Sequence, residues 1–327
     1  MAAQKATDDQ IIQAWGMANS PSVVAAMLGV SVRNLQKRRQ SIEAKIGRRL
    51  LTLDPLKRPA YDAAQMLHTE DRVEVKLTVK DGVILVGNDC HYHPSHVPTM
   101  HRAWCDLAQK LKPVAMVING DALDAPTAGR WAPIGWEHRV TLKQEIDTIQ
   151  DRLGELFHAC TTARRVWTCG NHDARLNTML AARVPEMRDM PGTELKDFFP
   201  EWTPAWFVTV NEGTESHTEI RHREKGGIHA SYNNTKESGI TIVTGHDHRA
   251  DVVAYDDRRG RRYGVRTGMV ADSPRDPQFV NYLEGRKVNW QSALGVLTYR
   301  AGMLLQPELA LRVDDEHYQF RGELVKV

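Results

Sequence analysis

Hydrophobic residues between positions 8 and 47 recur at the spacing typical of helices. Ser20-Pro21 and Ser31 are residues that often begin helices, and Gly29 supplies the left-handed conformation at which a helix often ends. The last of these predicted helices is basic on its outward side. Its inward side is predicted to carry Leu35, Ile42 and Ile46. A helix, a glycine turn and a basic helix together predict a small all-α helix-turn-helix domain over residues 1–50.

The pattern changes to that of strands from Val73 onward. Two strand-like runs, VEVKLTV and VILVG, flank Asp81-Gly82, and this arrangement predicts a hairpin. Apolar strands then alternate with amphipathic helices, of which the segment 138–159 has the most regular spacing. From Thr241 onward, strand-like runs joined by polar turns predict a second, largely antiparallel sheet.

These elements predict two domains. Residues 71–327 are expected to fold as an α/β domain, an α+β sandwich with two sheets flanked by helices. Residues 51–70 contain two prolines and have mixed character, so they are expected to form a linker to the helical domain.

Composition limits the classes of function. The formal net charge of +2 over 327 residues is too small for the whole chain to act as a polyanion binder, so any basic surface must be local. No apolar run is long enough to cross a bilayer, and the N-terminus lacks the apolar segment of a secretory signal. The four cysteines form no CxxC pair. We expect a cytoplasmic protein with reduced thiols that does not insert into membranes.

Residue types that bind metals follow four of the predicted strands. In chain order they are Asp89 and His91, Asp121 and Asp124, Asn171 and His172, and His246 and His248. A further histidine, His229, follows a pair of glycines and an isoleucine. Carboxylate and amide oxygens combined with imidazole nitrogens suit Mn, Fe or Zn. Two such ions lower the pKa of a shared water and hold phosphate oxygens, and Asp121 is the candidate that bridges them.

The order of these motifs resembles that of a known family. DxH, GDxxD, GNHD and GHxH occur in this order, each after an apolar strand, as in the calcineurin-like metallophosphoesterases. The resemblance covers about residues 73–327. It implies hydrolysis of phosphate esters with two divalent metal ions, manganese first and iron or zinc as alternatives.

The resemblance also implies a role for each residue. One ion would be held by Asp89, His91, Asp121 and His248, and the other by Asp121, Asn171, His229 and His246. His172 would protonate the leaving oxygen, and Asp124 would orient His172.

Some positions depart from the family pattern or allow alternatives. His217 and His222 compete with His229 for the same role. Ala125 stands where protein phosphatases of this family have an arginine, and Asp173 replaces their glutamate. A serine/threonine protein phosphatase is therefore disfavoured.

The basic helix of the N-terminal domain predicts DNA binding. Arg33, Asn34 and Lys37 are expected to face bases in the major groove, with Arg38 and Arg39 near phosphates. The alternative is a solvated basic face on a helical module for dimerisation or docking.

Three hypotheses for the function follow. The first is a phosphodiesterase or nuclease acting on DNA and tethered to it by the N-terminal domain. This pairing is similar to accessory enzymes of bacteriophages, as is the run NWQSALGVL. The alternatives are a small-molecule phosphodiesterase or phosphomonoesterase, acting for instance on cyclic nucleotides, and a DNA-binding regulator with an inactive metal domain. The loop with Arg130, Trp131, Trp136 and Arg139 is expected either to line the substrate groove or to pack over the sheet.

Overall fold

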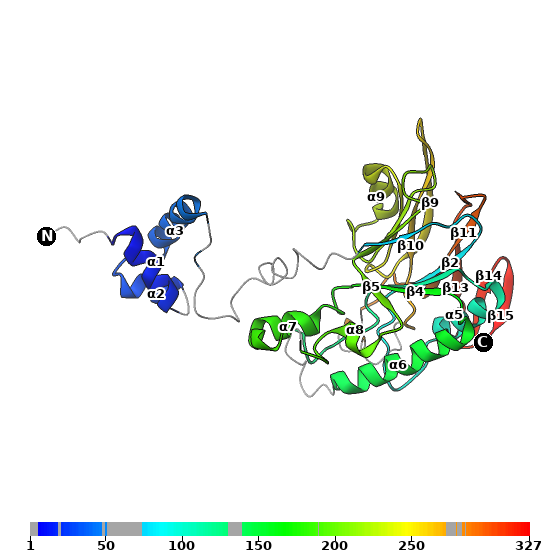
Figure 1. The fold of residues 1–327 in the computed structure, drawn as a ribbon, viewed down its shortest axis with the longest axis horizontal. Helices are drawn as coiled ribbons and strands as arrows, with labels where there is room; N and C mark the ends of the chain where they lie inside the picture. Colours follow the sequence, from blue (N-terminus) through cyan, green and yellow to red (C-terminus); the bar gives the residue numbers. More distant parts are fainter. Residues whose placement is uncertain are drawn as a thin grey trace. The chain divides into compact units, whose positions relative to one another are not determined.

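The computed structural model describes residues 6–18, 21–47, 50, 74–129, 139–188, 190–272, 279, 283–284 and 286–327 (Figure 1). The chain divides into two compact units, residues 1–71 with 178–188 and residues 72–177 with 189–327. The predicted linker over 51–70 lies outside the described residues, and so do Arg130, Trp131 and Trp136.

The N-terminal segment is helical, as predicted. Its helices are α1 (Asp8–Met17), α2 (Pro21–Met27) and α3 (Val32–Ile46). The Ser31 side chain caps α3 by accepting a hydrogen bond from the backbone N–H of Asn34, and Gly29 adopts a left-handed φ of 61° in the turn before it. Leu35 and Ile42 are buried, but Ile46 is 37% exposed, so its predicted inward position is wrong. Ile46 is the last residue of α3, and the buried cluster of this segment includes Ile42 and Leu50 but not Ile46.

The larger unit contains a nine-stranded sheet with the order β15-β14-β13-β11-β2-β3-β4-β5, in which β12 pairs with β11. Strands β2 to β5 are parallel, and the strands from β11 to β15 add antiparallel partners on one side. The strands are β2 (Gly82–Gly87), β3 (Ala115–Asn119), β4 (Arg164–Thr168), β5 (Thr203–Ala205), β11 (Ala293–Arg300), β12 (Met303–Leu304), β13 (Glu308–Arg312), β14 (His317–Phe320) and β15 (Glu323–Lys326).

A second sheet has six strands in the order β1-β6-β7-β8-β10-β9. Its pairs are mixed, with β1 parallel to β6, β8 parallel to both β7 and β10, and β9 antiparallel to β10. The strands are β1 (Glu74–Leu77), β6 (Phe207–Val210), β7 (Thr218–Arg221), β8 (Thr241–Thr244), β9 (Ala250–Asp257) and β10 (Gly260–Thr267).

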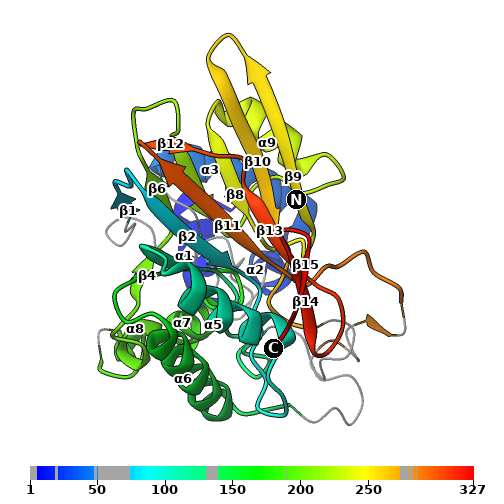
Figure 2. The ribbon, with the colours of Figure 1, turned by 90° about the vertical axis from the view of Figure 1, so that its right-hand side faces the viewer.

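The two sheets pack face to face, with helices on the outer faces (Figure 2). Along β2 the side chains alternate: Ile84 and Val86 enter the core between the sheets, whereas Val83 and Leu85 enter the core beneath the helices. Helices α5 (Thr99–Leu111) and α6 (Leu142–Ala159) cover the nine-stranded sheet, and α9 (Ala230–Ser238) contacts β8, β9 and β10 of the other. The predicted two-sheet α/β architecture flanked by helices is confirmed.

Helix α6 begins later than predicted from the segment 138–159. Thr141 caps it in a capping box with Gln144, and His138 lies outside the described residues. The regularly spaced apolar residues face the sheet, and those that are buried are Ile146, Ile149, Leu153 and Leu156. The other helices in the described part of the chain are α7 (Arg175–Arg183), α8 (Leu195–Phe198) and a short 3-10 helix (Pro185–Met187).

Two predictions about strand pairing are wrong. The strands on either side of Asp81-Gly82 form no hairpin, because β1 pairs with β6 in one sheet and β2 pairs with β3 and β11 in the other. The strands after Thr241 do not form a separate sheet, because β8, β9 and β10 belong to the six-stranded sheet and β11 to β15 to the nine-stranded one.

Among the helices that the structure describes, none combines the length and the hydrophobicity needed to span a bilayer.

Candidate metal centre

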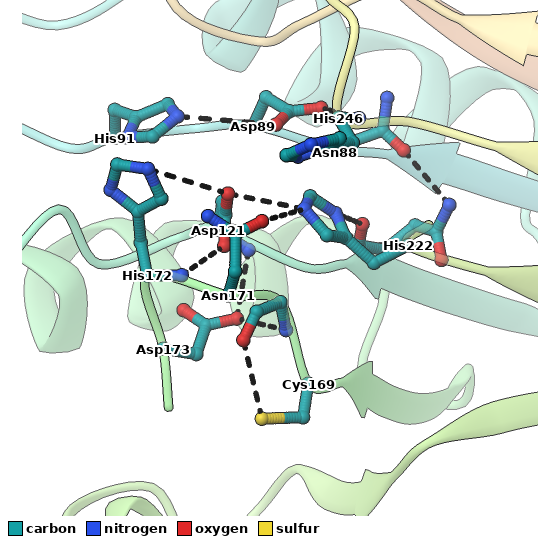
Figure 3. Close-up of polar contacts among 12 residues, drawn as sticks. Asn88, Asp89, His91, Asp121, Cys169, Asn171, His172, Asp173, His222 and His246 are labelled. Carbon is teal, nitrogen blue, oxygen red and sulfur yellow. Dashed lines mark hydrogen bonds and ion pairs between the residues drawn. The ribbon is translucent and has the colours of Figure 1, made fainter. Parts of the chain in front are cut away.

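Five strands, drawn from both sheets, end at one cluster of polar side chains (Figure 3). The parallel strands β2, β3 and β4 place their carboxyl ends at the same edge of the nine-stranded sheet, and the parallel strands β7 and β8 do the same in the six-stranded sheet. A contact of 3.1 Å between Nε2 of His222, after β7, and Oδ2 of Asp121, after β3, joins the two edges. The site therefore lies where the two sheets meet.

The first group of potential ligands consists of Asp89, His91 and His248, whose ligand atoms lie within 4.8 Å of one another. Oδ1 of Asp89 has no hydrogen-bond partner among the described residues. It faces Nε2 of His248 at 3.3 Å and Nε2 of His91 at 3.9 Å. The other carboxylate oxygen of Asp89 accepts a hydrogen bond of 2.8 Å from the backbone N–H of His246. One oxygen is thus fixed by the protein while the other points into the group.

The second group consists of Asp121, His222 and His246, also within 4.8 Å of one another. His222 Nδ1 lies 2.8 Å from the carbonyl oxygen of Asn119 and donates to it. Nε2 faces a carboxylate and an amide oxygen, so it carries a proton in the charged ring and is free to bind an ion once that proton is released. Nε2 of His222 also lies 3.3 Å from Oδ1 of Asn171. An imidazole fixed through Nδ1 in this way presents Nε2 as a ligand, as metal-binding histidines commonly do.

His229 is not part of this group, so the predicted assignment of this ligand is corrected to His222. His229 is exposed at the start of α9, whereas His222 is buried directly after β7. His222 directly follows the last residue of β7, whereas residues 223–228 separate His229 from that strand end. His217, the other alternative, precedes β7 and so lies at the opposite end of that strand.

The backbone of the candidate ligands is held in an unusual conformation. Asp89, His91, Asp121, His246 and His248 have φ values of 50°, 41°, 53°, 71° and 57°. Each L residue in the left-handed region costs about 1–2 kcal/mol. Five such residues around one cluster indicate that the surrounding structure fixes the directions of these side chains for function rather than for stability.

Two glycines allow close approach within the cluster. A Cβ on Gly170 would lie 2.0 Å from Oδ1 of Asp121, and a Cβ on Gly245 would lie 2.5 Å from Oδ1 of Asn88. Asn88 in turn accepts a hydrogen bond of 3.0 Å from the side chain of Asn119. The sequence motifs therefore require glycine at these positions because the carboxylate and amide groups occupy the space of a side chain.

His172 and Asp124 form a pair beside the cluster. Nδ1 of His172 donates to Oδ1 of Asp124 at 2.7 Å, and the backbone N–H of His172 donates to Oδ1 of Asp121 at 2.8 Å. The opposite nitrogen, Nε2, accepts from Nη2 of Arg175 at 3.1 Å, and Nη1 of Arg175 donates to the Asp124 carbonyl oxygen at 2.6 Å. The structure thus brings together the predicted pair and adds Arg175, which lies outside the sequence motifs.

Asp173 organises the loops rather than facing the ligands. Its buried carboxylate accepts hydrogen bonds from the backbone N–H groups of Gly170, Asp121 and Leu123 and from the indole of Trp167. These bonds join the loops after β3 and β4, so the last residue of the GNHD motif fixes the position of the candidate bridging residue.

Electrostatics show that the site is suited to cations. Burial raises the pKa of Asp121, but His222, His172 and His91 together outweigh this effect, and the pKa falls below its ordinary value. Burial acts against protonation of His222, yet Asp121 and Asp89 raise its pKa to about 9. Burial and the nearby His222 lower the pKa of His246 to about 4. Two buried carboxylates therefore attract positive charge, and the donor set of carboxylate, amide and imidazole fits divalent ions.

The residues predicted to bind DNA divide into two sets. Arg33, Asn34 and Lys37 are exposed on α3, as predicted. Arg38 instead donates to Asp8 at 2.6 Å, and Arg39 donates to Glu43 at 2.7 Å. The guanidinium of Arg39 also lies over the Trp15 ring at 5.1 Å. Both side chains are thus paired within the helical segment, and their position near phosphates stays a prediction.

The loop after GDxxD is described only in part. Nη1 of Arg139 donates to the carbonyl oxygen of Pro126 at 3.1 Å. This bond supports packing of the loop at this residue.

Comparison with known proteins gives distant similarities. No family model matches this sequence. Gene 54 protein of Mycobacterium phage D29 is 25% identical over 220 residues, which span 61% of this chain and 81% of that protein. Gene 54 protein of Mycobacterium phage L5 is 24% identical over the same extent. Both relatives come from bacteriophages, in agreement with the resemblance of this sequence to phage enzymes.

Among solved structures, Vacuolar Protein Sorting 29 from Cryptosporidium parvum has a TM-score of 0.38 and 11% identity, over 76% of this chain and 97% of that chain. YfcE, a phosphoesterase from E. coli, has a TM-score of 0.31 and 14% identity, over 69% and 97%. The nuclease MPE from Pseudomonas putida has a TM-score of 0.31 and 15% identity, over 68% and 86%. Similarities of this size assign the chain to no family.

Proposed function

We propose that this protein is a dinuclear-metal phosphoesterase of the calcineurin-like type that acts on phosphodiesters in DNA. The observation that carries the proposal is the position of the His172–Asp124 pair directly beside two groups of carboxylate and imidazole ligands. The order of the four motifs along the sequence supports it independently.

The residues present fit two divalent ions. One would be held by Asp89, His91 and His248 and the other by His222, His246 and Asn171, with Asp121 between them. When bound, such ions lower the pKa of a shared water and offset the negative charge of a phosphate ester. Manganese, iron and zinc all accept this donor set.

His172 supplies the proton for the leaving oxygen in this proposal. Burial opposes its charged form, but the hydrogen bond to Asp124 and the charges of Asp121 and Asp124 together outweigh burial and raise the pKa of His172. The proton at Nδ1 stays with Asp124. Nε2 accepts from Arg175 only in the neutral ring; the charged ring, which the raised pKa favours, carries at Nε2 the proton that passes to the leaving oxygen. A leaving oxygen would take the place of this guanidinium contact. Arg175 then remains close enough to attract a phosphate oxygen.

The choice of DNA rests on the N-terminal helices. Arg33, Asn34 and Lys37 form an exposed polar and basic face on a helix that follows a short turn, as in DNA-binding helix-turn-helix segments. Binding of this face to DNA would raise the local concentration of the phosphodiester near the metal centre.

The test is a substrate screen of the full-length protein after chelation and after reloading with Mn²⁺. The substrates are single-stranded, double-stranded and nicked DNA, cyclic nucleotides, and chromogenic monoesters and diesters. The proposal predicts manganese-dependent cleavage of DNA and of the chromogenic diester. Activity that survives exhaustive chelation would contradict the metal centre, and turnover of cyclic nucleotides without DNA cleavage would favour the small-molecule enzyme.

A variant pair tests the role of α3. R33A/K37A is expected to weaken DNA binding by about 1–3 kcal/mol for each lost base contact while leaving hydrolysis of the chromogenic diester unchanged. K110A/K143A removes the same charge from exposed positions on α5 and α6 and serves as the control. Equal DNA affinity of the two variants would contradict the DNA-binding face.

A further inference from the structure

A separate group of side chains that can bind metals lies between α5 and α6 and shares no residue with the candidate metal centre. His101 and Cys105 are four residues apart on α5, so they lie on one face of that helix. Glu155 faces them from α6, which packs against α5. One ligand atom from each of these three residues lies within 4.8 Å of the other two.

The distances within this group are close to those of a tetrahedral metal site. Sγ of Cys105 lies 3.7 Å from Nε2 of His101, and Oε2 of Glu155 lies 2.7 Å from the same nitrogen. Metal–ligand lengths of about 2.3 Å for sulfur and about 2.0 Å for nitrogen and oxygen give separations of about 3.5 Å for S···N and about 3.3 Å for N···O. The His101–Glu155 separation must widen by about 0.6 Å, and the Cys105–Glu155 separation, which is within 4.8 Å, must come to about 3.5 Å. Glu155 can make this adjustment because its side chain is 45% exposed.

The surroundings of His101 suit a metal ligand. Its ring is fully buried, and Nδ1 lies 2.8 Å from the hydroxyl of Tyr92. That hydroxyl can accept a hydrogen bond from Nδ1–H, which leaves the Nε2 lone pair for an ion. Arg152 holds the other carboxylate oxygen of Glu155 at 3.0 Å, so the ligand oxygen keeps its direction.

An open cavity of about 520 Å³ adjoins the three side chains. His158, three residues after Glu155 on α6, lines the same cavity. The cavity gives an ion a path of entry and leaves a fourth position for water or for the imidazole of His158.

We propose that His101, Cys105 and Glu155 form a separate binding site for a single divalent transition-metal ion of the zinc type. Binding releases one proton to solvent, from the Cys105 thiol, while the neutral His101 ring keeps its single proton and moves it from Nε2 to Nδ1. Because the thiol must lose its proton to become a ligand, occupation of the site weakens as pH falls. The site joins α5 to α6 and would stabilise the helical layer over the nine-stranded sheet.

Titration of the full-length protein with Co²⁺ tests this site by a signal that the candidate metal centre does not produce. Thiolate coordination gives a charge-transfer band in the near ultraviolet, whereas a centre of carboxylates, amide and imidazoles gives only the weaker visible bands of cobalt. We expect the band in the wild-type protein and its loss in C105S. The control C160S, which changes a buried thiol at the end of α6 outside the group, should keep it.

Two further variants keep the test decisive if C105S folds poorly. E155Q changes a partly exposed side chain and should weaken cobalt binding, and Y92F should weaken it by about 10-fold through loss of the support to Nδ1. A wild-type protein without the charge-transfer band overturns the proposal. A band that persists in C105S also overturns it, because another cysteine would then be the ligand.

Discussion

Gly170→Ala tests whether the contact between the β4 loop and the candidate bridging residue controls activity. The added Cβ would lie 2.0 Å from Oδ1 and 2.5 Å from the backbone nitrogen of Asp121, whereas ordinary contact begins at 3.4 Å. The carboxylate or the loop must therefore move by about 1.4 Å. A displacement of about 1 Å in a reacting group lowers rates by about 100-fold, and crowding of a packed region costs about 1–3 kcal/mol of stability.

The assay compares kcat/KM for a chromogenic phosphodiester, metal content and thermal unfolding in G170A and in G154A. Gly154 lies in the interior of α6, and no atom lies within 4 Å of the position its Cβ would take. G154A should therefore leave activity unchanged and stabilise the protein by about 0.5–1 kcal/mol. We expect G170A to lose about 100-fold in kcat/KM while it remains folded. Wild-type kcat/KM in G170A would refute the inferred role of the close contact at Asp121.

Three more substitutions test other parts of the site. H172A should lower kcat by about 10²–10⁴-fold and keep its full metal content, and loss of metal would show that His172 is a ligand instead. H222A should lose bound metal while H229A retains it, because His222 lies beside Asp121 and His229 is exposed; metal analysis that gives the reverse order would reinstate His229. Burial and, to a smaller extent, Asp124 raise the pKa of Glu145 from 4.5 to about 8, so the folded protein holds a proton that the unfolded chain releases. Stability should then fall as pH rises from about 4.5 to about 8, and E145Q should flatten this part of the unfolding profile; an unchanged profile would contradict the raised pKa.

The sequence predicted most of the site because its chemistry is local. Asp89, Asp121, Asn171 and His246 each follow an apolar strand within a few residues, so the strand pattern and the ligand type are visible together. Parallel strands then bring their carboxyl ends to the same edge of a sheet.

The histidine after β7 was assigned wrongly because this strand gives a weak signal. Its sequence, TEIR, has four residues with two charged ones, and His222 follows without a glycine beside it. His229 has the more conspicuous context of two glycines, yet its side chain is exposed. The position of β7 between β6 and β8 would have identified His222, but this pairing is not local in sequence.

Strand pairing between distant segments also limited how much of the fold could be predicted from the sequence. Asp81-Gly82 is a good hairpin sequence, but β1 gains its partner from β6, more than a hundred residues later. Arg38 and Arg39 show the same limit at the level of side chains, because their partners Asp8 and Trp15 are on another helix. Periodicity reports which face of an element is buried and not which element covers it.

The central claim is that two metal ions lie on either side of Asp121. The most direct measurement is a crystal structure of the manganese-loaded protein with anomalous scattering data. We expect two anomalous peaks that share Asp121, one beside Asp89, His91 and His248 and the other beside Asn171, His222 and His246. A single peak, or none within this cluster under saturating manganese, would contradict it.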